Sequence, residues 1–347
     1  MPEDRCGYTA RLSGIENVGA VCCWRPTWDE TDRCIWHTAE TVPPAAYRRT
    51  APNLGERLDG ADLRGAVLAE TGYLAGCSLI GADFTDAVLD HADLSGTDLR
   101  RASFRDVDAR EASFAGANLH DSVFVFVDLR GANFEDAMLY RAGLTDVRIN
   151  LQTTFGEMAV YENDLDRDAS DGATTEMADS AKWVYRELQR VYDENAFPER
   201  VQQNFLREMD LRRRQAWQTG NYLQALKLAG SRWIMRYGTS PWRVVLTSLA
   251  TILVCALLYP ITGGIREVRG EETITYQIAN PTEASGRVLI SAFFRSLYFS
   301  VVTFGTLGYG DIQPVGGWAR VIASVESLLG IMLMALLVFV LTRSVQH

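Results

Sequence analysis

The chain has 347 residues, 47% of them apolar and 22% charged, a composition that excludes a disordered, collagen-like or coiled-coil protein. The formal net charge is -10, which argues against a general nucleic-acid binder, because such proteins hold phosphates with Lys and Arg. Only Lys182 and Lys227 are lysines, and we take this acidic, lysine-poor composition as the basis for a hypothesis of a halophilic source.

Residues 1–45 form a segment rich in cysteine that we expect to be a small cap. Its candidate metal ligands are Cys6, Cys22, Cys23, Cys34 and His37. The N-terminus lacks the pattern of a signal peptide, so we expect a cytoplasmic location, where clustered cysteines more often bind metal than form disulfides. Zinc takes four such ligands, so Cys6, Cys34, His37 and one of the pair Cys22/Cys23 predict a structural Zn²⁺ site. The alternative is a set of free thiols beside the packed tryptophans Trp24, Trp28 and Trp36.

Residues 54–150 repeat with a period of five. From Leu74 to Ile149 every fifth residue is apolar, mostly Leu or Phe, and the residue two positions before it is small or β-branched. Leu63 and Leu68 follow the same rule one residue out of phase, which predicts an insertion near Thr71–Tyr73. A period of five fits neither a helix nor a strand, and it indicates a solenoid whose large residues fill the interior.

Units such as GADFT, GANLH and GANFE resemble those of the pentapeptide-repeat family. The resemblance implies a right-handed, four-sided β-helix with about twenty residues per coil. Some members of that family are acidic DNA mimics that bind topoisomerases, but we favour a rigid spacer or assembly module here. Val123, Val125 and Phe126 flank the repeat centre Phe124 and are expected to point outward, towards another subunit or the following helices.

Residues 151–240 are predicted to connect this solenoid to a membrane domain. Residues 157–179 are acidic and rich in Asp, Ala and Thr, and they indicate a loop. Helices follow, one of them opened by Pro198 in the favoured first-turn position. The amphipathic segment 221–240 carries aromatic residues suited to the membrane interface.

Residues 241–347 contain two long apolar stretches, predicted as membrane-spanning helices at 244–265 and 320–342. A shorter apolar run at 290–304 lies between them and is too short to cross the bilayer fully. It indicates a re-entrant helix that leads into the loop 306–311, since non-helical backbone at membrane depth is tolerated only where it is buried or lines a pore.

This loop has the chemistry of a cage of carbonyl oxygens. Its residues are Thr306, Leu307, Gly308, Tyr309, Gly310 and Asp311. The two glycines adopt positive φ at low cost, so successive carbonyls can point the same way, and four such loops around one axis replace the hydration shell of K⁺. The loop resembles the potassium-channel signature TVGYGD, with Leu307 in place of Val. The order helix, pore helix, filter, helix over about residues 243–343 is similar to that family too, and the resemblance implies a homotetramer conducting K⁺.

Several residues of this domain leave alternatives open. Gly330 matches the family's inner-helix hinge, and close helix packing is the other interpretation. Gly305 stands where the family more often has Thr, and Leu307 replaces Val, so a weakly selective cation channel of the same fold remains an alternative. Glu326 is a carboxylate at membrane depth, where a charge is usually functional or paired. Arg295 is its candidate partner, and a protonated, hydrogen-bonded Glu326 is the alternative.

Together these patterns predict a membrane α-helical fold class: a tetrameric potassium channel with two membrane helices per subunit, joined to a cytoplasmic β-helix. We expect a plasma-membrane location with both termini in the cytoplasm. The expected partners are lipid, further copies of the chain and an unidentified cytoplasmic regulator, with no nucleic acid. The permeant K⁺ and a structural Zn²⁺ are the expected ions, and no catalytic constellation is evident. The remaining alternative is a membrane-tethered pentapeptide module that binds a protein or mimics DNA.

Overall fold

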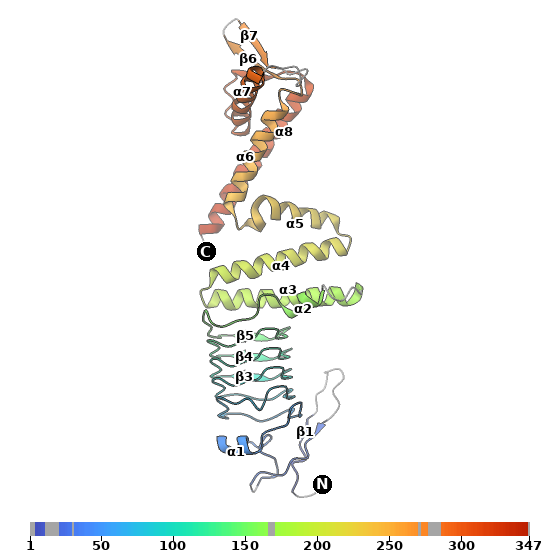
Figure 1. Ribbon diagram of the computed structural model, residues 1–347, viewed down its shortest axis with the longest axis vertical. Coiled ribbons are helices and arrows are strands. Elements are labelled where there is room, and N and C mark those ends of the chain that lie inside the picture. Colours follow the sequence, from blue (N-terminus) through green and yellow to red (C-terminus); the bar gives the residue numbers. More distant parts are fainter. Residues whose placement is uncertain are drawn as a thin grey trace. The chain divides into compact units, whose positions relative to one another are not determined.

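The computed structural model (Figure 1) describes residues 4–10, 21–29, 31–165, 171–269, 272–276 and 286–345. Parts of the predicted cap, acidic loop and membrane domain lie outside these ranges. The chain divides into two compact units, Met1–Thr219 and Gly220–His347. This division falls before the predicted domain boundary at residue 240, because α5 (Tyr222–Met235) contacts α6 (Pro241–Leu258) of the second unit.

The first unit begins with the cap, a short antiparallel pair of β1 (Thr9–Ala10) and β2 (Val21–Cys22), followed by α1 (Pro44–Arg49). Trp36 is fully buried, and its carbonyl accepts a hydrogen bond at 2.9 Å from the backbone N–H of Asp62. The cap thus extends the hydrogen bonding of the first coil and closes the solenoid core at that end.

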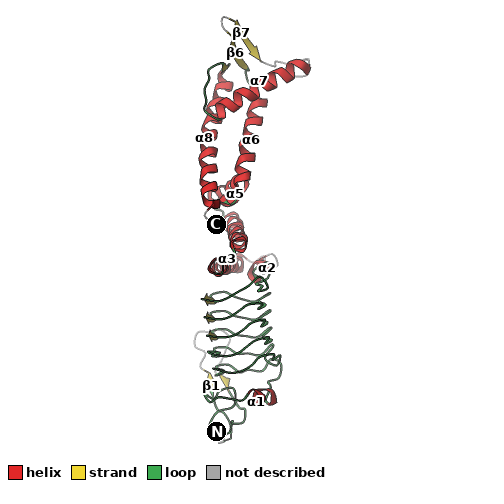
Figure 2. Cartoon of the chain, turned by 90° about the vertical axis from the view of Figure 1, so that its left-hand side faces the viewer, coloured by secondary structure: helices red, strands yellow, loops and turns green. Residues whose placement is uncertain are grey.

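The five-residue repeats form a β-helix of stacked coils (Figure 2). One face carries the parallel strands β3 (Ser103–Arg105), β4 (Val123–Val125) and β5 (Gly143–Thr145). Asp62 pairs with Asp83, and Asp83 in turn pairs with Ser103, so the first step is one residue longer than the second. This difference in length places the predicted insertion near Thr71–Tyr73 in the first of these steps.

Large residues fill the inside of the β-helix, as the period predicts. The rings of Phe84 and Phe124 stack on opposite faces of Phe104, with centroids 4.7 and 4.4 Å apart. A second stack contains Phe114, Phe134 and Phe155. At the corners, the residue two positions after each repeat centre from Leu74 to Leu144 has positive φ, as at Phe126 (58°). Phe126 is 60% exposed, which agrees with the expectation that it points outward.

Helices cover the other end of the β-helix: α2 (Val160–Leu165), α3 (Asp171–Glu194) and α4 (Pro198–Gln218). The predicted loop at 157–179 is corrected, because α2 and the first turns of α3 lie within it. Its Ala, Glu and Met residues favour a helix, and acidic residues suit a helix N-terminus. Pro198 opens α4, as predicted.

Side chains of α3 and of Asn195, which directly follows it, satisfy the open backbone groups of the last coil. The Leu144 N–H donates to Glu187 Oε1 at 3.0 Å, and the Arg190 guanidinium donates to the Leu144 carbonyl at 3.0 Å. The Ile149 N–H donates to Asn195 Oδ1 at 3.1 Å. The solenoid therefore has a protected edge at this end, where an open edge would invite pairing with another chain.

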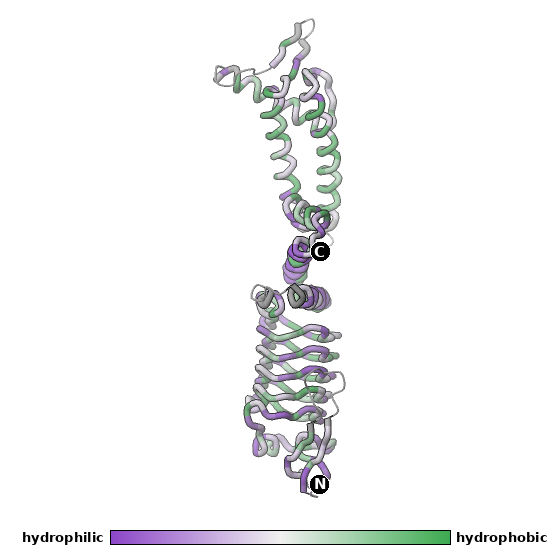
Figure 3. The backbone as a smooth tube through the Cα atoms, turned by 90° about the vertical axis from the view of Figure 1, so that its right-hand side faces the viewer, coloured by the Kyte–Doolittle hydropathy of each residue, from purple (hydrophilic) through white to green (hydrophobic). Residues whose placement is uncertain are grey.

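The second unit combines apolar helices with a small antiparallel sheet of order β7-β6-β8. Its further elements are η1 (Arg236–Gly238), β6 (Ile265–Arg269), β7 (Glu272–Tyr276), α7 (Gly286–Phe304), β8 (Ile312–Pro314) and α8 (Gly317–Val345). Figure 3 shows apolar residues along α6 and α8, and these two helices are long and apolar enough to cross a membrane.

The observed bounds of the three predicted apolar helices differ from the predicted ones. The first membrane helix ends at Leu258 and not at Ile265, because Pro260 follows and the chain turns at Gly263 (φ 137°) into β6. Helix α7 ends at Phe304 as predicted but begins earlier than 290. Helix α8 extends beyond 320–342 at both ends.

Candidate functional site

The glycine-containing loop leaves α7 directly after its last turn. The Thr306 N–H donates to the Thr303 carbonyl at 3.1 Å, and the Leu307 N–H donates to the Val302 carbonyl at 3.0 Å. Beyond this point the loop 306–311 is exposed in the single chain, with Tyr309 66% exposed. Most of the surface of this loop is therefore uncovered in the single chain.

Both glycines of the loop adopt positive φ, as the sequence predicts. Gly308 and Gly310 have φ of 59° and 77°. Thr306 also has positive φ, 53°, which the sequence did not indicate, because non-glycine residues seldom adopt this region. Asp311 accepts hydrogen bonds from the Tyr298 hydroxyl at 2.9 Å and the Ile312 N–H at 3.1 Å, so the far end of the loop is tied back to α7.

Gly330 lies in the middle of α8, against the C-terminal end of α7. A Cβ atom at this position would overlap the Phe304 carbonyl oxygen and lie 3.0 Å from the Phe304 carbonyl carbon. Helix α8 runs through Gly330 without interruption. Close packing thus accounts for this glycine, and its role as a hinge stays a prediction.

Glu326 is fully buried where α8 meets α6 and α7. Its carboxyl group accepts a hydrogen bond from the Tyr259 hydroxyl at 2.5 Å and contacts the Ser300 hydroxyl. The expected pairing with Arg295 is wrong, because Arg295 lies 2.6 Å from Glu267 Oε1, on β6. The sequence analysis did not identify Tyr259 and Ser300 as the partners of Glu326. The signal that could have found them is the presence of two hydroxyl groups in otherwise apolar segments.

Four predicted ligands come together in the cap: Cys6, Cys23, Cys34 and His37. Their ligand atoms all lie within 4.8 Å of one another. The Cys34 sulfur is 3.6 Å from the Cys23 sulfur and 3.3 Å from His37 Nδ1. Cys22, which the structure also describes, lies outside this cluster, since neighbouring residues of an extended chain point to opposite sides. Of the two neighbouring cysteines, Cys23 is thus the one that joins the cluster.

The surroundings of His37 suit a metal ligand. Its Nε2 lies 3.2 Å from the Asp59 carbonyl oxygen, and this contact orients the ring so that Nδ1 faces the three thiols. The Tyr8 ring stacks on the His37 ring, with the two ring centroids 4.2 Å apart. The hydrogen bond between the two thiols lowers the pKa of Cys23 to about 4 and raises the pKa of Cys34, which favours one thiolate, the form of cysteine that binds metals.

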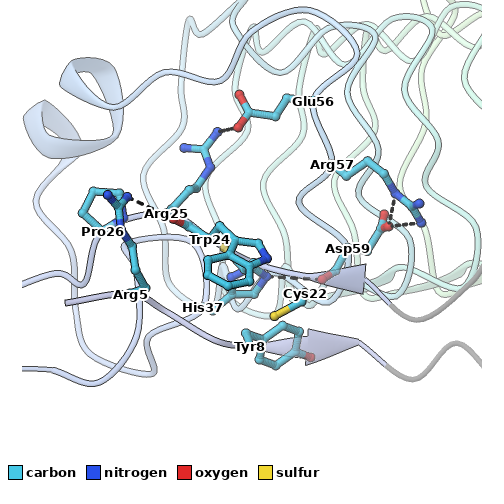
Figure 4. Close-up of a pocket in the computed structure, with 11 residues that line it drawn as sticks. Arg5, Tyr8, Cys22, Trp24, Arg25, Pro26, His37, Glu56, Arg57 and Asp59 are labelled. Carbon is cyan, nitrogen blue, oxygen red and sulfur yellow. Dashed lines mark hydrogen bonds and ion pairs between the residues drawn. The ribbon is translucent and has the colours of Figure 1, made fainter. Parts of the chain in front are cut away.

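A cavity of about 520 Å³ adjoins the cluster, and Cys23 and His37 form part of its wall (Figure 4). Its three arginines already have acceptors. Arg25 pairs with Glu56 at 2.5 Å, and Arg57 pairs with Asp59 at 2.7 Å. Arg5 donates to the carbonyl of Trp24 at 3.1 Å. Carboxylates of the chain therefore balance the charges of two of these three arginines.

Comparison with protein families agrees with this geometry. The family model described as "Ion channel" matches residues 272–347. The model for pentapeptide repeats, with eight copies, matches residues 73–106, 97–136 and 110–146. The chain joins a pentapeptide-repeat domain to an ion channel domain. Its second unit therefore belongs in a membrane.

Several solved structures are similar to the pentapeptide-repeat domain. Rfr23, a pentapeptide repeat protein from the cyanobacterium Cyanothece 51142, is 20% identical, with 28% of this chain and 90% of that chain covered and a TM-score of 0.21. A pentapeptide repeat protein from the Arabidopsis thaliana thylakoid lumen is 26% identical, with 30% and 74% covered and a TM-score of 0.18. QnrB1, a plasmid-mediated fluoroquinolone resistance protein, is 17% identical, with 30% and 67% covered and a TM-score of 0.20. The comparison with curated proteins finds no match.

Proposed function

We propose that the protein is a potassium-selective channel in which four copies of the chain surround one pore. The observation that carries this proposal is the loop 306–311, which follows α7 with Gly308 and Gly310 at positive φ. In this arrangement the carbonyl groups of Thr306, Leu307, Gly308 and Tyr309 replace the water shell of K⁺, and Leu307 contributes only its backbone.

The exposure of the loop supports an assembly of several copies. Leu307 is 57% exposed and Tyr309 66% exposed in one chain, although both are large and apolar or aromatic. A single loop supplies only one side of a cage, whereas copies around a common axis surround the ion. Symmetric closure of identical subunits is the usual way to complete such a site.

The position of the tryptophans supports a membrane-spanning arrangement. Trp242 begins α6 and Trp318 begins α8, and they are 64% and 74% exposed. Tryptophan is enriched at both membrane interfaces. We place the protein in the plasma membrane, with both termini and the pentapeptide-repeat domain on the cytoplasmic side and lipid around α6 and α8.

The β-helix then acts as a cytoplasmic module through which an unidentified regulator reaches the channel. A DNA mimic needs unpaired carboxylates, but many aspartates of the β-helix are paired within the chain. The aspartate two residues before each of four arginines forms an ion pair with it, at 2.6 to 2.8 Å: Arg64, Arg100, Arg110 and Arg130. This internal pairing favours the module over the mimic.

Ion flux from liposomes tests the proposal. Purified protein should release K⁺ down a K⁺ gradient and little Na⁺ down an equal Na⁺ gradient. Gly308→Asp should abolish the flux, because it removes the residue that adopts positive φ and adds a charge to the carbonyl cage. Equal K⁺ and Na⁺ fluxes would establish the weakly selective cation channel instead. No flux from the wild type would favour a membrane-tethered interaction module.

For the cap, we propose that Cys6, Cys23, Cys34 and His37 hold a structural Zn²⁺. The ligand types, their number and the spacing of their atoms suit tetrahedral zinc. The site then ties the cap to the first coil, since His37 contacts the Asp59 carbonyl of that coil. Such a site contributes to folding directly.

Elemental analysis and X-ray absorption test the zinc site. Purified protein should contain about one zinc per chain, bound to three sulfurs and one nitrogen. Cys34→Ser should lose the metal, whereas the matched variant Cys22→Ser should keep it, because Cys22 lies outside the cluster. Metal-free wild type, or loss of zinc from Cys22→Ser alone, would refute the assignment.

A further inference from the structure

The carboxyl group of Glu326 joins three helices at one point. Glu326 is on α8, Ser300 is on α7, and Tyr259 directly follows α6. Both Glu326 and Ser300 are fully buried. The Tyr259 hydroxyl lies 2.5 Å from Glu326 Oε2, and the Ser300 hydroxyl contacts Oε1. A buried polar group of this kind is costly unless every donor and acceptor finds a partner.

The Ser300 hydroxyl has a second neighbour. Its oxygen lies 2.9 Å from the carbonyl oxygen of Ile252 on α6. A carbonyl oxygen only accepts hydrogen bonds, and a hydroxyl has a single proton to donate. If Glu326 were ionised, the Ser300 hydroxyl could donate its proton either to the Ile252 carbonyl or to Glu326 Oε1. The other of these two oxygens would then lie close to the Ser300 oxygen with no proton between them.

We propose that Glu326 is a neutral carboxylic acid that donates its proton from Oε1 to the Ser300 oxygen. Ser300 then donates to the Ile252 carbonyl, and Tyr259 donates to Glu326 Oε2. Each contact in this series has one donor and one acceptor. The neutral form also avoids the cost of a charge at membrane depth.

The groups around Glu326 agree with a neutral acid. Among the described residues, the side chains that contact its carboxyl group are Tyr259, Ser300 and the Cys255 thiol of α6, none of which is a cation. Arg295, the candidate partner on α7, is engaged by Glu267. The ion pair that an ionised glutamate needs is therefore not provided.

This hydrogen-bonded series makes Glu326 a positioning residue for the carbonyl cage. Ser300 is one turn before Phe304, where α7 ends and the loop begins. Because the series links α7 to both α6 and α8, it holds the end of α7 and hence the start of the loop. Loss of one partner leaves a buried polar group unsatisfied beside this end.

Infrared spectroscopy of the full-length protein in lipid at neutral pH tests the protonation state. Wild type should show the carbonyl stretch of a protonated carboxylic acid, and Glu326→Gln should lose it. Glutamine keeps the contacts, because its amide donates to Ser300 and accepts from Tyr259, so this variant should fold. Glu267→Gln is the matched control and should keep the band, since Glu267 is paired with Arg295. A wild type without the band, or a band that persists in Glu326→Gln, would overturn the proposal.

A second measurement tests the positioning role, and it rests on the proposed K⁺ conduction. Ser300→Ala and Glu326→Ala should lower the ratio of K⁺ to Na⁺ flux by about tenfold, while Glu326→Gln should retain the wild-type ratio. A wild-type ratio in both alanine variants would overturn the positioning role. Should the wild type conduct no K⁺, the channel proposal fails, and the infrared result still decides whether Glu326 is neutral.

Discussion

Large apolar side chains are buried in the β-helix, whereas many of those in the channel domain are exposed in the single chain. Phe84, Phe104 and Phe124 are fully buried within one chain. On α8, by contrast, Leu328 is 63% exposed and Val338 64% exposed. The solenoid completes its own core, whereas the channel domain presents apolar faces to its surroundings, which in the proposed assembly are lipid and further copies of the chain. A substitution should therefore affect local stability in the first unit and assembly or conduction in the second.

Among substitutions that disturb packing, the largest effect is expected at Gly330. Gly330→Ala should reduce K⁺ flux by about tenfold or more, because the new methyl group overlaps the Phe304 carbonyl and pushes α7 away from α8. Liposome flux and the yield of assembled protein measure this effect. Gly317→Ala, on the same helix but with no atom within 4 Å of its Cβ position, is the control and should behave as wild type. Normal flux in Gly330→Ala would mean that the two helices are not closely packed.

Within the β-helix, the largest effect should come from the phenylalanine stack. Phe104→Ala should destabilise the coils by about 3 to 5 kcal/mol, because it leaves a cavity between Phe84 and Phe124. Phe126→Ala should change stability by less than about 0.5 kcal/mol, because this ring is exposed. Hydrogen exchange of the coils in the full-length protein measures both. Equal effects would show that the exposed ring has a partner in the assembly.

A smaller effect is expected where α3 covers the last coil. Asn195→Ala removes the acceptor of the Ile149 N–H and a donor to the Val147 carbonyl, and it should cost about 1 to 3 kcal/mol. Hydrogen exchange should localise the loss to the last coil. Glu194→Ala removes only a part-exposed ion pair with Arg190 and should cost at most about 1 kcal/mol. Uniform loss of protection in all coils would contradict a local role for Asn195.

The smallest effect is a dependence of stability on pH. Burial lowers the pKa of His120, whose Nε2 lies 2.6 Å from the Tyr161 hydroxyl. The unfolded chain then binds a proton more readily than the folded one, so stability is complete above about pH 6.5 and falls below it, by at most about 1.4 kcal/mol per pH unit. Unfolding experiments between pH 5 and about 7.5 should show this slope in wild type. The slope should decrease in His120→Gln and persist in His91→Gln, whose side chain is half exposed. An unchanged slope in His120→Gln would assign it to other groups.

The repetitive part of the fold was predictable because each of its contacts recurs. A period of five places every fifth residue inside, and even the insertion near Thr71–Tyr73 is visible as a change of phase. The order of the channel elements was equally visible, because a membrane restricts the backbone to a few solutions.

The corrected features depend on contacts between distant residues. The polar composition of residues 171–179 suggested a loop. They form part of α3 because this helix packs on α4, a contact that local composition does not reveal. The choice between Cys22 and Cys23 depends on which side of the chain faces His37. The partner of Arg295 is Glu267, on a strand whose pairing the sequence did not indicate.

The contact between Gly330 and Phe304 has a mechanical consequence. Phe304 is two residues before Thr306, where the carbonyl cage begins. Any bend of α8 at Gly330 moves the support beneath the last carbonyl of α7 and so changes the geometry around the ion. In the proposed channel, opening at the inner mouth and ion discrimination at the outer mouth should therefore be coupled, so that a stimulus acting on one is transmitted to the other.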